Sequence, residues 1–134
     1  MLDIAICDCH ASQLETLEKL IVKYLFDEDE LNIDIYDTSE ELMQCLSERK
    51  SSYDLLFTEI STENANGFEV AQFLRKSNLD TEIVFLSDSL KEVLTAFKYR
   101  AFDYVIKPVG EADIHDLLER YQYYHNSRTE EYFS

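Results

Sequence analysis

The chain has 134 residues and a formal net charge of −16, with 28 acidic and 12 basic residues. This length suits a single domain that can bury a substantial core. An acidic surface repels phosphate backbones, so the composition argues against nucleic-acid binding by this segment itself. No apolar run approaches the roughly 18 residues of a membrane span, so no membrane association is expected. With only 2 Gly and 1 Pro, a disordered chain and a turn-rich all-β fold are also disfavoured.

The N-terminus and the cysteines indicate the compartment. The first three residues, Met-Leu-Asp, lack the basic segment that opens a secretion signal. The chain contains 3 cysteines, and an odd number without a secretion signal indicates reduced thiols. We therefore expect a cytoplasmic protein without disulfides.

The chain opens with a predicted strand followed by a predicted helix. Residues 2–7 form a short, mostly apolar run that ends at Asp8, as a buried strand does. Leucines and other apolar residues then recur at helical spacing, which predicts a helix over residues 12–26. Ser12 is expected to cap this helix, with Glu15 completing a capping box.

The same alternation continues through the middle of the chain. Apolar residues alternate with polar ones over residues 31–35, which predicts a half-buried strand. Thr38 or Ser39 can cap the helix that follows. Residues 53–57 predict a second buried strand, which should end near Glu59.

The second half repeats this rhythm. Its predicted elements are, in order, a helix opened by Gly67, a strand over residues 82–86 that ends at Ser87, a helix over residues 90–97, a strand over residues 104–106 and a helix over residues 114–121. Strands that alternate with helices predict right-handed crossovers on a parallel sheet. Five such pairs predict a doubly wound α/β fold, and no internal repeat or second domain is visible.

Polar side chains stand where four of the predicted strands end. They are Asp8 and Cys9, Thr58 and Glu59, Ser87, and Lys107 before Pro108. In open parallel sheets, ligands bind beyond the carboxyl ends of the strands, at the switch point of the topology. Two carboxylates, a hydroxyl, an ammonium and a thiol are therefore expected to converge on one crevice. The alternative is that these residues are polar only because the strands leave the core there.

Four segments resemble the receiver domains of bacterial response regulators, which are also called CheY-like domains. These segments are residues 4–8, 53–60, 83–87 and 101–108. The resemblance covers residues 2–124, and it is closest to receivers that precede LytTR-type DNA-binding domains. It implies a flavodoxin-like, five-stranded parallel sheet with strand order 2-1-3-4-5. It also implies a receiver domain over residues 1–125 and a linker that starts within residues 126–134.

The resemblance implies a role for each matching position. Glu59 stands at the phospho-acceptor position, Asp8 and Cys9 in the acidic pocket, Ser87 and Tyr104 at the switch, and Lys107 with Pro108 at the family's lysine and proline. In such domains an Asp accepts a phosphoryl group from a sensor histidine kinase, with the help of Mg²⁺. The implied partners are that kinase or another signalling protein, and a second copy on the face of helix four, strand five and helix five. DNA would be bound only through an output domain outside this chain.

Three departures from the family pattern bear on that function. Glu59 replaces the phospho-accepting Asp, Cys9 replaces an acidic residue, and Glu63 and Asn64 stand where the family has Pro and Gly. Magnesium prefers hard oxygen ligands, so we expect no metal, or weak Mg²⁺ binding at Asp8. The favoured interpretation is an interaction module that works independently of phosphorylation and controls an output domain. The alternative is a phosphorylatable receiver that uses Glu59 or another residue.

Other functions are disfavoured by the residues themselves. Residues 7–10, Cys-Asp-Cys-His, suggest a metal or redox site, but structural zinc usually takes four nitrogen or sulfur ligands at recognisable spacing. His10, His115 and His125 are scattered, and no nucleophile elbow or glycine-rich phosphate loop is present, so we do not expect an enzyme. The tyrosines within residues 121–124 fit either a contact with another chain or a cap on the core.

Overall fold

The computed structural model describes residues 2–25, 30–48, 52–60 and 66–133, with side chains described up to residue 125. Its five strands are β1 (Leu2–Cys7), β2 (Leu31–Tyr36), β3 (Leu55–Glu59), β4 (Glu82–Ser87) and β5 (Asp103–Ile106). Its five helices are α1 (Ala11–Tyr24), α2 (Ser39–Glu48), α3 (Gly67–Lys76), α4 (Val93–Lys98) and α5 (Glu111–Phe133). Among the described residues, no helix is both long and apolar enough to cross a membrane.

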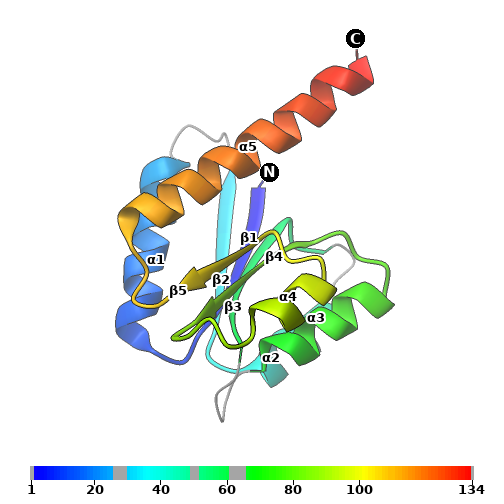
Figure 1. The fold of residues 1–134 in the computed structure, drawn as a ribbon. Helices are drawn as coiled ribbons and strands as arrows, with labels where there is room; N and C mark the ends of the chain where they lie inside the picture. Colours follow the sequence, from blue (N-terminus) through cyan, green and yellow to red (C-terminus); the bar gives the residue numbers. More distant parts are fainter. Residues whose placement is uncertain (1, 26–29, 49–51, 61–65, 134) are drawn as a thin grey trace.

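The strands form one parallel sheet in the order β2-β1-β3-β4-β5. Helices α1 and α5 cover one face, and α2, α3 and α4 cover the other (Figure 1). The predicted fold class and strand order are therefore confirmed. Because the chain moves outward in both directions from the centre, the switch point lies between β1 and β3.

The sheet separates two hydrophobic cores, because successive side chains of a strand point to opposite faces. Ile4, Ile6 and Phe57 pack against α1 and α5, whereas Ala5 and Leu56 pack against the helices on the other face. All five residues of β3 are buried. A central strand that is covered on both faces reads as a nearly continuous apolar run, which is why it was recognisable in the sequence.

One predicted helix cap is wrong and another is confirmed. Helix α1 begins at Ala11 with His10 as the N-cap, whose side chain makes no capping hydrogen bond, so the predicted capping box of Ser12 and Glu15 is wrong. The chain enters the helix earlier because the backbone N–H of His10 donates to Asp8 Oδ1 at 2.8 Å, which closes the turn after β1. In α2 the cap is Thr38, one of the two predicted residues, and its Oγ1 accepts a hydrogen bond from the Glu41 N–H at 3.1 Å.

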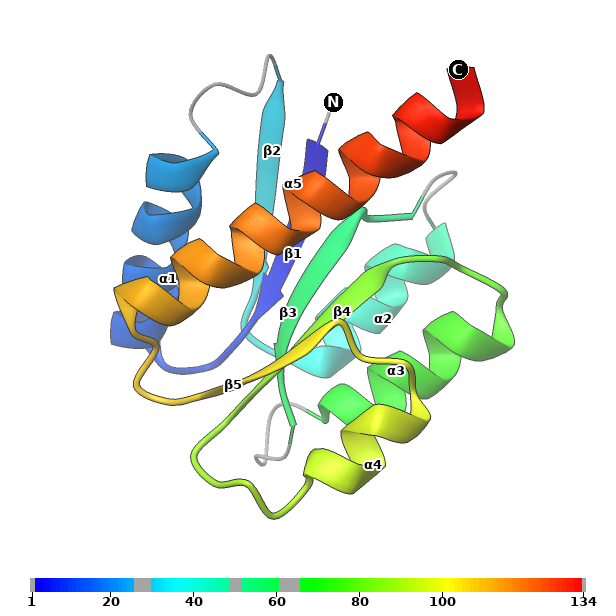
Figure 2. The same ribbon diagram turned by 45° about the horizontal axis from the view of Figure 1, so that its top comes forward.

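Other boundaries shift by a few residues. Strand β3 begins at Leu55, two residues after its predicted start, and α4 begins at Val93 and spans only 6 residues. Helix α5 extends well beyond the sheet (Figure 2), and its backbone continues through residues 126–133. The sequence predicts the start of a linker in that segment, and the position of the domain boundary stays a prediction. Glu63 and Asn64 lie outside the described residues.

Gly67 sets how closely α3 approaches the end of β3. A Cβ atom at this position would lie 2.3 Å from the carbonyl oxygen of Glu59, which is closer than real atoms pack. The Gly67 N–H also donates to the carbonyl of Ile60 at 2.9 Å. The glycine that opens α3 therefore fixes the strand end that carries Glu59.

Candidate functional site

Three charged side chains meet at the carboxyl end of the sheet. Asp8 follows β1, Glu59 is the last residue of β3, and Lys107 follows β5. The Lys107 Nζ lies 2.8 Å from Asp8 Oδ2 and donates a hydrogen bond to Glu59 Oε1. The predicted convergence of strand ends across the switch point is present in the structure.

The three side chains of this ion-paired cluster are largely buried, so the charge of each one is stabilised by its partners. Asp8 is 1% exposed and Glu59 is 3% exposed, while Lys107 is 13% exposed. Burial by itself raises the pKa of Glu59, but hydrogen bonds from Lys107 and from the backbone N–H of Cys9 outweigh it and hold that pKa at about 2. Burial by itself lowers the pKa of Lys107, and its two carboxylate partners reverse that direction. Glu59 and Lys107 are therefore both charged at neutral pH.

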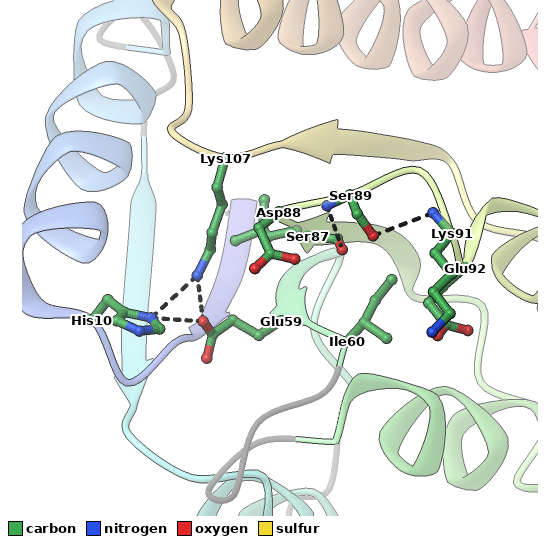
Figure 3. Close-up of a pocket in the computed structure, with 10 residues that line it drawn as sticks. His10, Glu59, Ile60, Ser87, Asp88, Ser89, Lys91, Glu92 and Lys107 are labelled. Carbon is green, nitrogen blue, oxygen red and sulfur yellow. Dashed lines mark hydrogen bonds and ion pairs between the residues drawn. The ribbon is translucent and has the colours of Figure 1, made fainter.

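His10 joins the cluster from the turn before α1. Figure 3 shows His10, Glu59 and Lys107 pointing toward one another. The His10 Nδ1 lies 2.8 Å from Glu59 Oε1 and 3.1 Å from Asp8 Oδ1, and these hydrogen bonds to Asp8 and Glu59 raise the pKa of His10. When His10 is protonated, its charge and that of Lys107 balance the two carboxylates. The sequence prediction did not assign His10 to the pocket, because only the turn after β1 brings it there.

The two cysteines near β1 have different environments. Cys9 is exposed, and both its backbone N–H (3.3 Å) and its Sγ (3.5 Å) donate hydrogen bonds to Glu59 Oε2. Cys7 is buried in the core beneath α2 and α3, where burial raises the pKa of its thiol to about 12. Strand β1 ends at Cys7, so the two thiols do not share one face. The pocket thus contains Cys9 but not Cys7.

The two residues predicted as switch positions, Ser87 and Tyr104, lie beside the charged cluster. Ser87, at the end of β4, lines a cavity of about 250 Å³ together with Glu59 and Lys107. The Ser87 Oγ accepts a hydrogen bond from the backbone N–H of Ser89 at 3.2 Å. Tyr104 packs its ring against the core, and its hydroxyl donates to the carbonyl of Ser89 at 2.7 Å. Both positions therefore hold the loop between β4 and α4.

Pro108 completes the predicted set next to the lysine. It is exposed, and the Lys107–Pro108 peptide bond is cis. The structure thus gathers Asp8, Cys9, Glu59 and Lys107 around one crevice, with Ser87 at its rim and Tyr104 behind the adjoining loop. Glu59 stands at its centre, since contacts from every charged partner converge on its carboxylate.

Comparisons with known proteins agree with this geometry. The model of the response regulator receiver domain family matches residues 4–119. Sensory transduction protein LytT of Bacillus cereus is 35% identical over 96 residues, which cover 72% of this chain and 37% of the relative. LytT of Bacillus subtilis is 32% identical over 94 residues, covering 70% of this chain and 38% of the relative. The chain therefore spans little more than a third of the length of these relatives.

Solved structures share the fold. The response regulatory domain of protein mrkE from Klebsiella pneumoniae superposes with a TM-score of 0.76 at 23% identity, covering 87% of this chain and 92% of that one. Response regulator DrrB of Thermotoga maritima superposes with a TM-score of 0.75 at 16% identity, covering 93% of this chain and 54% of that one. The family match and the LytT relatives confirm the resemblance predicted from the sequence. The chain belongs to the response regulator receiver domain family, the signalling modules of two-component systems.

Proposed function

We propose that this receiver domain signals through a preformed, ion-paired pocket and does not depend on phosphorylation of an aspartate. A single observation carries the proposal: Glu59, at the family's phospho-acceptor position, is buried and already bonded to Lys107. Its carboxylate supplies a fixed negative charge where a phosphorylated receiver gains one. A Glu–Lys pair with further hydrogen bonds satisfies both buried charges without a ligand.

The contacts of Glu59 also make it a poor phosphoryl acceptor. Its Oε1 is bonded to Lys107 and His10, and its Oε2 accepts hydrogen bonds from Cys9. An attacking oxygen would have to leave these partners. The side chain is longer than Asp by one methylene, and a displacement of about 1 Å from the reactive geometry can cost about a hundredfold in rate. Both effects act against phosphotransfer.

The pocket does not fit the Mg²⁺ that receiver domains use. Magnesium requires oxygen ligands in near-octahedral order, but half of the four candidate donor residues here are a thiol and an imidazole. The Lys107 Nζ contacts both Asp8 and Glu59, so an ion held by these carboxylates would have to displace the ammonium. No step of the proposed mechanism is therefore assigned to Mg²⁺.

The fixed charge would affect the protein surface through the loop between β4 and α4. Lys107 directly follows β5, and the Tyr104 hydroxyl on β5 is bonded to the carbonyl of Ser89 in that loop. The loop leads to α4, where Leu94 is 80% exposed and Phe97 is 82% exposed. We propose that the face formed by α4, β5 and α5 docks another protein chain, because large apolar side chains there lie open to solvent.

The longer relatives support a role within a larger regulator. We propose that this receiver controls a DNA-binding output domain of the LytTR type in the cytoplasm, with a sensor histidine kinase or another signalling protein as its input. The acidic charge of −16 assigns DNA contact to that output domain and not to the receiver. Activity of the whole regulator should then persist without a phosphodonor.

Intact mass spectrometry after incubation with acetyl phosphate and Mg²⁺ tests the proposal on the native protein and on Glu59→Asp. We expect no adduct on the native protein. An adduct of one phosphoryl mass on Glu59→Asp alone would show a pocket silenced by one methylene, and an adduct on neither would show that phosphotransfer is lost altogether. Both outcomes support the proposal.

An adduct on the native protein would overturn this proposal. It would establish the alternative function, a phosphorylatable receiver, which the presence of Asp8, Ser87 and Lys107 in family-like positions favours. Peptide mapping of the adduct would then identify the accepting residue.

A further inference from the structure

We propose that the pocket binds a divalent transition-metal ion of the Zn²⁺ class through Asp8, Cys9, His10 and Glu59. Only the signalling role of the metal ion rests on the proposed function: there the metal ion would replace the phosphoryl group as the signal. The binding itself stands on the geometry and the chemistry of these four side chains.

The four donor atoms already lie at the spacing of a metal site. One ligand atom from each residue lies within 4.8 Å of all the others. Individual separations are 2.8 Å from His10 Nδ1 to Glu59 Oε1, 3.5 Å from Cys9 Sγ to Glu59 Oε2, and 3.8 Å from Cys9 Sγ to His10 Nδ1. Tetrahedral zinc with bonds of roughly 2.0 to 2.3 Å separates its ligand atoms by about 3.3 to 3.8 Å. Small side-chain rotations are therefore enough to complete the site.

The donor set selects the class of metal. One thiolate, one imidazole and two carboxylates suit zinc, cobalt or nickel, whereas magnesium takes oxygen ligands. Asp8 and Glu59 are buried, so they form the fixed floor of the site. Cys9 and His10 are exposed, so they leave an open side through which an ion can enter.

The buried carboxylate of Asp8 could also bind a metal ion. Asp8 is 1% exposed, and the cation that faces its Oδ2 is Lys107, whose Nζ lies 2.8 Å away. A metal ion would supply the positive charge that Lys107 now supplies. The cavity beside Lys107 leaves its ammonium room to withdraw. Metal binding and the Lys107–Glu59 pair are therefore mutually exclusive.

Titration with Co²⁺ tests the site, because tetrahedral cobalt bound to a thiolate gives a charge-transfer band and intense ligand-field bands. We expect one Co²⁺ per chain, displacement of Co²⁺ by Zn²⁺, and no displacement by excess Mg²⁺. Cys9→Ser should abolish the charge-transfer band, and His10→Ala should weaken binding by at least about tenfold. Lys107→Met should tighten binding, because it removes the competing cation.

Matched control variants distinguish binding at this site from non-specific metal binding elsewhere on the chain. Cys45→Ser removes another thiol, and His115→Ala removes a histidine that lies beside Glu119 on α5. Both variants should bind Co²⁺ as the native protein does, and circular dichroism checks that every variant is folded. The proposal fails if no band appears, if Cys9→Ser keeps the band, if Mg²⁺ competes, or if one ion binds two chains. These outcomes are independent of the acetyl phosphate experiment, so the two proposals fail separately.

Discussion

Replacing Lys107 with methionine removes an ammonium from between two buried carboxylates while it keeps an unbranched, apolar stem of similar length. The pKa of Glu59 is held at about 2, against an ordinary value of 4.5. Each unit of pKa corresponds to about 1.4 kcal/mol, so the contacts of Glu59 contribute about 3 kcal/mol to stability at neutral pH. Breaking a buried ion pair by removing one partner typically costs about 3 to 5 kcal/mol. We therefore expect Lys107→Met to lower the free energy of unfolding by about 3 kcal/mol.

The stability that the Glu59 contacts contribute should depend on pH. The pKa of Glu59 is lower in the folded protein than in the unfolded chain. The stabilisation is therefore complete above the unfolded value near 4.5 and is lost as the pH falls toward 2. The native protein should lose stability over that range. Lys107→Met should lose less, because the Lys107 ammonium no longer lowers the pKa of Glu59. The difference between the two proteins should be largest at neutral pH.

Urea unfolding of both proteins at neutral pH and at about pH 3 measures the difference. Lys98→Met is the matched control, since Lys98 is an exposed residue at the end of α4, and it should change stability by less than about 0.5 kcal/mol. A loss below about 1 kcal/mol for Lys107→Met at neutral pH, or a loss that does not change with pH, would refute the reasoning.

Two further predictions concern the start of α3, which supports the end of β3. Gly67→Ala should cost about 1 to 3 kcal/mol in urea unfolding, because its Cβ would meet the Glu59 carbonyl oxygen at 2.3 Å. Gly110→Ala is the control, since its nearest contact would be 3.6 Å away, and an equal loss in both variants would contradict the explanation. Asn66→Ala should cost about 1 kcal/mol, because the Asn66 side chain caps α3 by accepting a hydrogen bond from the Glu69 N–H. Asn66→Ser should recover most of that loss, and an unchanged midpoint for Asn66→Ala would show that the cap is not needed.

The periodicity of apolar residues predicted most of the fold. Buried strands such as β3 and β4 are nearly continuous apolar runs, and the helices carry apolar residues at helical spacing. These signals are local, so they can be read along the chain. The strand ends also lie where the runs stop, which is why Asp8, Glu59 and Lys107 were recognisable as neighbours in a parallel sheet.

Helix starts were predicted less well, because they depend on how the chain leaves the sheet. Ser12 and Glu15 have the spacing of a capping box, but the Asp8 carboxylate closes the preceding turn and starts α1 at Ala11. A local pattern does not contain that tertiary contact. The same limit applies to α4, where Leu90 fits the helical spacing but lies in the turn before the helix.

The residue types of the pocket can be read from the sequence alone, in particular that a Glu stands at the family's phospho-acceptor position and a thiol at one of its acidic positions. How these residues pair with one another depends on the fold. Strand β1 ends at Cys7, which is buried in the core, and the turn that follows exposes Cys9 and brings His10 to the carboxylates. The pairing of Lys107 with Asp8 and Glu59 joins three strands that are far apart in the chain. Electrostatic interactions depend on distance and burial, and both are set by the packed sheet.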